Sequence, residues 1–401
     1  LVLCPTRELS AQVAREFRKL GRSLPGLSVV VLAGGQALRD QVTALEKGVH
    51  LAVGTPGRVL DHLRRRTLKV HRVATVVLDE ADRMLEMGFT EDMTKILKAL
   101  PATRQTVFFS ATFSDSIEAL SKKYQRAPIR VHIEQQEQQP DIRQLVVHVA
   151  SEDKLKALAW TLEQHMGESA LVFTNLKARA FEIEKALSAA GVSASSLHGD
   201  LEQYDRDRVL AKFRNGSTRV LVATDVAARG IDLDKLGLVV NFDLPSQPEL
   251  YVHRIGRTGR AESSGIAVSF CARAELPKLE AIERYVGAAL TPIQRSAGAS
   301  KSSPSVPQRP GAGVTSNELE REAKMDTLRL SGGRKEKLRP GDILGALTGE
   351  AGGLAGEDVG KIEIHERFAY VAVKKSISAR ALRSLSEGRI KGKKFRVELV
   401  K

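Results

Sequence analysis

Cysteine and long apolar runs are almost absent from this sequence, and each absence excludes a class of protein. The two cysteines in 401 residues, Cys4 and Cys271, are too few for a disulfide framework and lack metal-ligand spacing. Both fit thiols packed in the core of a cytoplasmic protein. No apolar run approaches the roughly 18 residues that cross a bilayer, so we expect no membrane-spanning segment.

Acidic residues are also in deficit. Lys and Arg number 62 against 48 Asp and Glu, which gives a net charge of +14. No basic amphipathic helix with an aromatic face is visible, so nucleic acid is the expected partner ahead of a membrane surface. Residues 301–401 hold 21 Lys and Arg against 13 Asp and Glu. That surplus of 8 is more than half of the whole, so the carboxy-terminal quarter is the most basic part.

Two series of short apolar strands alternate with helical patterns, which is typical of two α/β domains with parallel sheets covered on both faces. Strands of the first series are expected at residues 1–4, 29–32, 51–53, 74–78 and 106–109. Strands of the second are expected at residues 170–173, 193–197, 219–223, 238–241 and 265–270. We place the first domain at 1–133, a linker at 134–144 and the second domain at 145–293.

A small third domain is expected behind a tether. Residues 294–327 include a stretch rich in Ser, Pro, Gly and Ala, which is typical of a flexible linker. Within residues 328–401 we expect strands at 342–347, 361–364, 368–373 and 395–400, and a helix at 376–387. That order suits a small α+β sandwich of the βαββαβ type. Its densest basic cluster is Lys391, Lys393, Lys394 and Arg396.

Three carboxylates directly follow the β-branched apolar run at residues 74–78. Asp79, Glu80 and Asp82 would lie beyond the carboxyl end of a buried strand, where ligands bind in open α/β sheets. In P-loop NTPases an aspartate in this position holds Mg²⁺, and a neighbouring carboxylate can orient the attacking water. The alternative is that Asp79 or Asp82 only caps the helix that opens at Arg83.

Two further segments could hold an anion. Thr55 precedes a proline and is typical of a helix start, where free N–H groups bind phosphate and Arg58 adds charge. The alternative for that segment is an ordinary helix entry. Arg254, Arg257 and Arg260 stand among apolar and glycine residues, which favours anion binding over a solvated surface. On a helix, Arg257 and Arg260 would leave the same side.

Nine short strings occur in the order of one family. Through both α/β domains the chain closely resembles the DEAD-box RNA helicases of superfamily two. The matching strings are Pro5-Thr6-Arg7-Glu8-Leu9, Gly34-Gly35, Thr55-Pro56-Gly57-Arg58, Asp79-Glu80-Ala81-Asp82, Ser110-Ala111-Thr112, Val172-Phe173-Thr174-Asn175, Gln203 with Arg206, Ala223-Thr224-Asp225 through Arg229-Gly230-Ile231-Asp232, and His253-Arg254-Ile255-Gly256-Arg257-Thr258-Gly259-Arg260. Residues 337–349 and 390–394 look like the DbpA branch of that family.

The resemblance implies the architecture and the partners. It implies two tandem RecA-like domains and a carboxy-terminal domain similar to an RNA recognition motif. It implies an ATP-dependent RNA helicase that uses ATP and Mg²⁺ and acts as a cytoplasmic monomer. The DbpA branch is associated with a hairpin of large-subunit ribosomal RNA and with ribosome assembly.

The resemblance also assigns roles to residues. Asp79 would position Mg²⁺, Glu80 would activate water, and Gly230 and Asp232 would belong to the nucleotide site, with Asp232 on the ribose. The residues that would couple nucleotide state to domain closure are Asp82, Ser110, Thr112 and His253, and the arginine fingers would be Arg257 and Arg260. The residues that would grip one RNA strand are Thr6, Arg7, Gly35, Thr55, Arg58, Gln203, Arg206 and Thr224.

Two departures from the family pattern matter. No Gly-x-x-x-x-Gly-Lys-Ser/Thr string occurs, so the amide cradle and lysine for the phosphates are missing. We expect that this loop lies upstream of Leu1 and that the chain as given does not hydrolyse ATP. In the third domain Glu366 stands where a basic residue is usual and residues 342–347 lack an aromatic. RNA capture by the loops and the run 389–396 is therefore favoured over capture by the sheet.

Two alternatives to the helicase remain open. An RNA-binding protein without enzymatic activity is compatible with the missing phosphate loop. A DNA helicase is less favoured, because both the Asp-Glu-Ala-Asp string and the terminal domain point to RNA.

Overall fold

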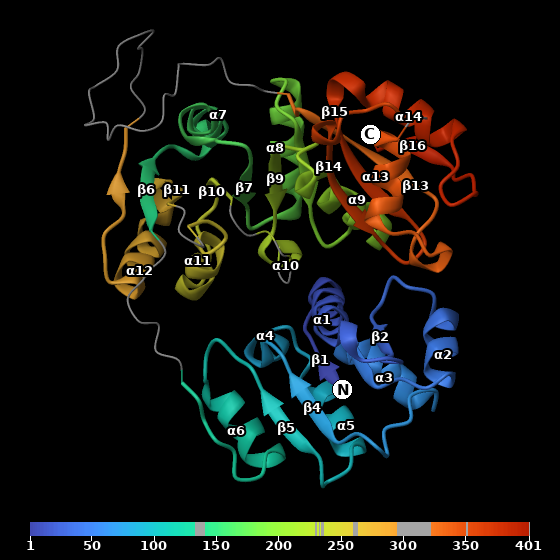
Figure 1. The fold of residues 1–401 in the computed structure, drawn as a ribbon. Helices are drawn as coiled ribbons and strands as arrows, with labels where there is room; N and C mark the ends of the chain where they lie inside the picture. The colour runs from blue at the N-terminus through green and yellow to red at the C-terminus, as the bar shows by residue number, and fades with distance from the viewer. Residues whose placement is uncertain are drawn as a thin grey trace. The chain divides into compact units, whose positions relative to one another are not determined.

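The computed structural model describes residues 1–132, 141–228, 231, 233, 236–259, 264–294, 322–349 and 352–400. Its contacts divide into two compact units, the first built on residues 1–132 and the second on residues 141–400 (Figure 1). In these ranges no helix is both long enough and apolar enough to cross a membrane.

Unit 1 is a five-stranded parallel sheet in the order β2-β3-β1-β4-β5. Its strands are β1 (Val2–Leu3), β2 (Val29–Leu32), β3 (Leu51–Gly54), β4 (Thr75–Leu78) and β5 (Gln105–Phe108). Its helices are α1 (Arg7–Leu20), α2 (Leu38–Glu46), α3 (Pro56–Arg64), α4 (Ala81–Glu86), α5 (Thr90–Ala99) and α6 (Asp115–Tyr124). Because neighbouring residues of a strand point to opposite faces, Leu3 and Val2 join two separate cores.

The first part of unit 2 is a seven-stranded parallel sheet in the order β12-β6-β11-β10-β7-β9-β8. Its strands are β6 (Ile142–His148), β7 (Ala170–Phe173), β8 (Ala194–Leu197), β9 (Val220–Ala223), β10 (Leu238–Asn241), β11 (Gly265–Cys271) and β12 (Thr291–Pro292). Its helices are α7 (Lys154–His165), α8 (Lys177–Ala189), α9 (Gln203–Arg214), α10 (Asp225–Ala228), α11 (Pro248–Ile255) and α12 (Leu276–Val286).

The rest of unit 2 is a carboxy-terminal domain with an antiparallel sheet in the order β14-β15-β13-β16. Its elements in chain order are β13 (Met325–Leu330), α13 (Pro340–Thr348), β14 (Val359–Ile364), β15 (Ala369–Lys374), α14 (Ser378–Glu387) and β16 (Val397–Leu399). Helices α13 and α14 share one core with the sheet. The predicted βαββαβ order and fold class are confirmed.

One predicted strand of that domain is wrong. Residues 342–347 lie inside α13, because Pro340 starts the helix and the Asp342 carboxylate accepts the N–H of Arg339 at 2.7 Å. Ile343 and Leu347, four residues apart, both point into the core. The opening strand is β13, which begins at Met325. The linker predicted over 294–327 therefore extends too far, and the domain begins before residue 328.

Candidate functional site

The predicted site residues of unit 1 lie along one edge of its sheet. Those predicted to bind RNA follow β1, β2 and β3: Thr6, Arg7, Gly35, Thr55 and Arg58. Those predicted to handle the nucleotide follow β4 and β5: Asp79, Glu80, Asp82, Ser110 and Thr112. Since β1 lies between β3 and β4, one edge presents both groups side by side.

The turn from β4 into α4 places two carboxylates at this edge. Glu80 is the N-cap of α4 and has left-handed backbone angles, φ 51 and ψ 53, which are costly for a residue with a Cβ. The turn is pinned because Asp79 N–H donates to Leu3 at 2.9 Å and Ala81 N–H donates to Phe109 at 2.9 Å. The alternative in which Asp79 or Asp82 caps the helix does not hold, because Glu80 occupies the cap and its side chain makes no capping bond.

Asp82 ties β4 to the loop after β5. Its Oδ2 accepts both the N–H and the hydroxyl of Thr112, each at 2.9 Å, and the Ser110 hydroxyl accepts the Asp82 N–H at 3.3 Å. Burial would raise the pKa of Asp82, but the hydrogen bonds from Thr112 and Arg83 N–H outweigh it and the pKa is lowered. The carboxylate therefore stays charged and holds the two loops together.

A magnesium ion fits the Asp79 carboxylate. Burial raises the pKa of Asp79, so a neighbouring cation would offset the cost of the buried charge. The described part of the chain holds no group of three or more His, Cys, Asp or Glu that could form a metal cage. An ion held by one carboxylate would take its other ligands from water and phosphate, as Mg²⁺ commonly does. No amide cradle for the phosphates accompanies it, since the sequence lacks the phosphate-loop string.

Two glycines shape the opposite end of this edge. A Cβ on Gly34 would lie 2.9 Å from the Arg7 guanidinium, so only glycine lets that side chain lie against the β2 loop. Gly35 has φ +76, which favours glycine. Thr6 caps α1, and its hydroxyl accepts the Leu9 N–H at 3.2 Å.

Arg58 is held by a buried network that the sequence analysis missed. Arg58 donates to Gln41 Oε1 at 3.1 Å, and Gln41 Nε2 donates to the carbonyl of Ala33 at 2.9 Å. His62, which is fully buried, contacts the same Oε1 through Nε2 at 2.9 Å and Thr67 through Nδ1 at 2.8 Å. Burial lowers the pKa of His62, and Arg58 adds to the shift. A neutral imidazole thus donates to Gln41. No motif marked these residues in the sequence.

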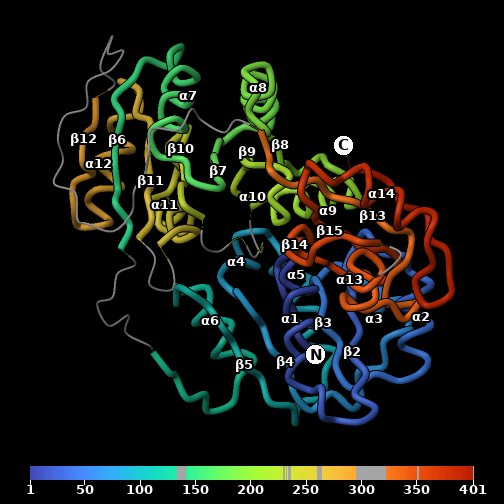
Figure 2. Tube along the Cα trace, turned by 45° about the horizontal axis from the view of Figure 1, so that its top comes forward, coloured from blue at the N-terminus to red at the C-terminus, as the bar shows by residue number. Residues whose placement is uncertain are grey.

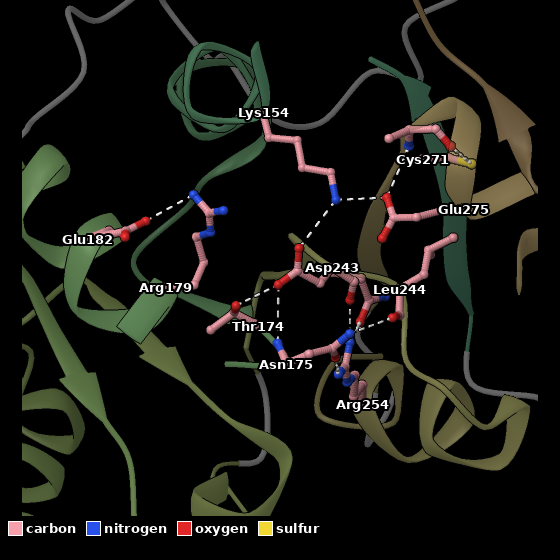
Figure 3. A network of polar contacts seen from close by, with 12 residues as sticks. Lys154, Thr174, Asn175, Arg179, Glu182, Asp243, Leu244, Arg254, Cys271 and Glu275 are labelled. Atoms are coloured by element: carbon pink, nitrogen blue, oxygen red, sulfur yellow. Dashed lines mark hydrogen bonds and ion pairs between the residues drawn. The ribbon is translucent and has the colours of Figure 1, made fainter. Parts of the chain in front are cut away.

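In unit 2, Arg254 lies at the centre of a buried polar network (Figure 3). Its Nε and Nη2 donate to the two oxygens of Asp225 at 2.7 Å each, and Nη2 also donates to Asn175 at 2.8 Å. Its Nη1 donates to Asn241 at 3.2 Å and to the carbonyl of Asp243 at 2.7 Å. Five donors thus meet five acceptors at the ends of β7, β9 and β10. The prediction that Arg254 helps to bind an external anion is therefore wrong.

A second cation, Lys154, closes this network from α7. Its ammonium contacts Asp243 at 3.3 Å and Glu275 at 2.8 Å (Figure 3). Thr174 donates to the same Asp243 carboxylate at 2.6 Å. Burial alone would raise the pKa of Asp243, but the Thr174 hydroxyl and Lys154 lower it. Both buried cations therefore have carboxylate partners.

The remaining predicted residues of unit 2 follow β8, β9 and β10. Gln203 and Arg206 begin α9, and Arg206 donates to the Ala227 carbonyl at 2.6 Å, close to Thr224. His253 lies on α11, but that helix ends at Ile255 and Arg257 lies in the turn beyond it. The prediction that Arg257 and Arg260 share a helix face is wrong for Arg257. Gly230, Asp232 and Arg260 lie outside the described residues.

The basic cluster of the carboxy-terminal domain is unequally exposed. Lys391 pairs with Asp342 at 2.8 Å and donates to the Lys337 carbonyl at 2.9 Å, so it also fastens the start of α13. Lys393 and Lys394 are exposed. These two lysines are the better candidates for binding phosphate.

Comparison with known proteins places the whole chain. Residues 1–120 match the DEAD/DEAH box helicase model, residues 153–262 the helicase conserved C-terminal domain, and residues 327–399 the DbpA RNA binding domain. The ATP-dependent RNA helicase DbpA of Escherichia coli is 46% identical over 401 residues, which is 100% of this chain and 84% of that protein. The DEAD-box ATP-dependent RNA helicase CshA of Geobacillus kaustophilus is 46% identical over 71% of this chain and 61% of its own length.

A solved structure is similar over both parallel sheets. Dbp5 of S. cerevisiae, bound to RNA and ADP BeF3, is 32% identical with a TM-score of 0.64. The similarity covers 73% of this chain and 76% of that chain.

The strain at Glu80 yields a stability prediction. Glu80→Gly and Glu80→Ala both remove the carboxylate, but only glycine adopts left-handed angles freely. The strain of about 1–2 kcal/mol, less about 0.5–1 kcal/mol for the looser unfolded chain, makes the glycine variant the more stable by about 0.5–1 kcal/mol. Hydrogen-exchange protection of β4 measures this. Lys95→Gly and Lys95→Ala in the middle of α5 should rank the opposite way, and an alanine advantage at position 80 would contradict the argument.

Arg254 yields a second prediction. Arg254→Met leaves Asp225 buried without its cation and should destabilise the domain by about 3–5 kcal/mol. Arg254→Lys should recover little, because one ammonium cannot meet five acceptors, whereas Arg254→Met combined with Asp225→Asn should recover part. Urea denaturation followed by Trp160 fluorescence reports on this unit, since Trp160 lies on α7 and packs on its core. Equal stability of Arg254→Lys and the unmutated chain would show that the fork geometry is unimportant.

Proposed function

Because this chain belongs to the DEAD-box RNA helicase family and carries a DbpA RNA-binding domain, we propose that it separates short RNA duplexes locally, at the expense of ATP, during assembly of the large ribosomal subunit. We also propose that it acts in the cytoplasm as a monomer. Its two cysteines are both buried thiols, which suits a reducing compartment.

The carboxyl edge of unit 1 is the observation that supports this function most directly. Carboxylates suited to Mg²⁺ and water occupy its β4–β5 end, and Arg7, Thr55 and Arg58 occupy its β2–β3–β1 end. Asp82 and Thr112 join the acidic strand to the next one. A change in one loop of this row is therefore felt by its neighbours through a single rigid sheet.

The chemistry assigned to the residues follows from their charges. Bound ATP with Mg²⁺ would supply the phosphoanhydride bond and a divalent charge. Asp79 would hold that ion through water, and Glu80 would orient the water that attacks. Arg257, from the turn after α11, would contribute positive charge, and Arg254 would act as a positioning residue for that turn. Arg206, held at Ala227 beside Thr224, would contact the RNA backbone, which carries no sequence information.

The target is proposed from the third domain. A DbpA RNA-binding domain suggests a structured ribosomal RNA, and the basic surplus of residues 301–401 suits a polyanion. We assign the binding surface to Lys393 and Lys394 and the neighbouring Arg396, all exposed.

A second candidate function rests on the missing phosphate loop. The chain as given would then bind RNA without hydrolysing ATP. In a malachite-green assay with Mg²⁺, ATP and RNA we expect it to release no phosphate above the blank. Fusing the phosphate-loop segment of a DEAD-box helicase ahead of Leu1 should restore RNA-stimulated release, and Glu80→Gln in that fusion should abolish it.

The three outcomes are distinct. Turnover by the unfused chain would show that the loop is dispensable. A fusion that binds RNA but stays inactive would favour the non-enzymatic function. A fusion whose activity survives Glu80→Gln would remove Glu80 from the reaction.

The basic cluster gives a binding prediction. Lys393→Ala together with Lys394→Ala should weaken RNA binding and reduce the slope of log K against log salt by about 0.7–0.9 for each phosphate that is no longer neutralised. Arg273→Ala with Lys278→Ala, two exposed cations near α12, is the control for the change in net charge and should alter the slope little. Lys391→Ala is kept separate, because it also removes the ion pair with Asp342. An unchanged slope in the double variant would place the RNA elsewhere.

A further inference from the structure

The two faces of the carboxy-terminal sheet have different neighbours. Leu328 and Leu330 of β13 and Val371 of β15 point into the core beneath α13 and α14. Residues that alternate with them, such as Thr327 and Tyr370, point to the opposite face. That face lies beside α9 in both views (Figure 1, Figure 2), and Tyr370 is fully buried against Ala211 of α9. The outer face of the sheet is therefore covered by the helicase part of the same unit.

The contact is polar and specific at the end of α9. Thr327, fully buried, shares a hydrogen bond with the Ser217 hydroxyl at 2.6 Å and accepts from Asn215 Nδ2 at 3.3 Å. A methyl group on Gly216 would lie 3.8 Å from Met325, which is ordinary contact distance. The chain that leaves α9 thus runs directly along β13.

A charged pair lies beside this contact. Arg214 of α9 contacts Glu363 of β14 at 3.3 Å, and Lys361 contacts the same carboxylate at 3.0 Å. Burial would raise the pKa of Glu363, but a hydrogen bond with His365 and the charges of Arg214 and Lys361 lower it to about 2. The carboxylate is therefore charged at every physiological pH, and it repels phosphate.

The third contact reaches the other end of α9. The Arg329 guanidinium lies 5.1 Å from the centre of the Tyr204 ring and 5.3 Å from that of Phe368. Tyr204 follows Gln203, which is the first residue of α9. The covered face thus extends along the whole helix, from its predicted RNA-gripping start to the turn at its end.

We propose that this sheet face is a docking surface for α9 of the same chain, so that the carboxy-terminal domain and α9 move as one body. Its partner is a basic helix, and the negative Glu363 and the buried Tyr370 favour that helix over RNA. RNA bound at Lys393 and Lys394 would then lie at a fixed distance from Gln203 and Arg206. This consequence rests on the proposed function, but the docking itself does not.

A reversible lock tests the docking. Ser217→Cys with Thr327→Cys places two thiols where hydroxyls lie 2.6 Å apart, within reach of a disulfide. The native Cys4 and Cys271 are buried and should not compete. We expect the full chain to form the crosslink nearly completely under mild oxidation and each single variant to form none. Arg214→Glu should slow crosslinking, and Arg179→Glu, at an exposed pair on α8, should not.

RNA binding of the locked chain decides what the face is for. With a fluorescent RNA hairpin carrying a single-stranded extension, Kd of the oxidised double variant should equal that of the reduced one. If the sheet stacks RNA bases, locking should weaken binding about tenfold or more, with recovery in dithiothreitol. That result, or failure to crosslink, would overturn the proposal. Loss of RNA binding by the unmutated chain would instead overturn the proposed function and leave the crosslink to be read by itself.

Discussion

The parallel pairing of β1 with both β3 and β4 is the constraint on which the site in unit 1 depends. Leu3 is opposite Gly54 on one side and Leu78 on the other, and it is fully buried. A shift of one residue in this register would turn its side chain to the other face and leave buried backbone groups unpaired. The register therefore fixes the positions of Thr6, Thr55 and Asp79 relative to one another before any ligand binds.

Unit 2 meets the same requirement with buried charge. The loops after β7, β9 and β10 are short and polar, and Arg254 joins all three by donating to side chains or carbonyls in each. A buried ion pair is weak evidence of net stability, because its desolvation offsets much of its attraction. It does, however, require one arrangement of partners. Arg254 thereby fixes where α11 ends and where the turn with Arg257 begins.

The sequence revealed the parallel sheets more readily than the network between their loops. Strands such as Val29–Leu32 and Leu238–Asn241 are apolar throughout because both faces are covered, so their pattern is visible in the sequence. Residues 342–347 are equally apolar, and a short apolar run does not distinguish strand from helix. Pro340 and the capping carboxylate of Asp342 were the signals that should have decided it.

Buried polar residues were harder to recognise for a different reason. Arg254 and Gln41 look like surface residues in a linear sequence, and their roles depend on acceptors far away along the chain. Arg254 meets Asn175, which is 79 residues away, and Gln41 meets His62, which is 21 residues away. No local periodicity carries that information. The charge of the chain likewise predicted a polyanion partner without saying which surface it would bind.

The carboxy-terminal sheet illustrates how neighbouring charge decides the use of an aromatic residue. Tyr370 on an open sheet with basic neighbours could stack on a base, but here it is buried against α9 next to Glu363. Because the pKa of Glu363 is lowered to about 2 from its ordinary 4.5, its stabilising contribution is present above 4.5 and is lost only as the pH falls toward 2. Acidification within the physiological range therefore cannot release this face, and any change in docking has to come from forces on α9 itself.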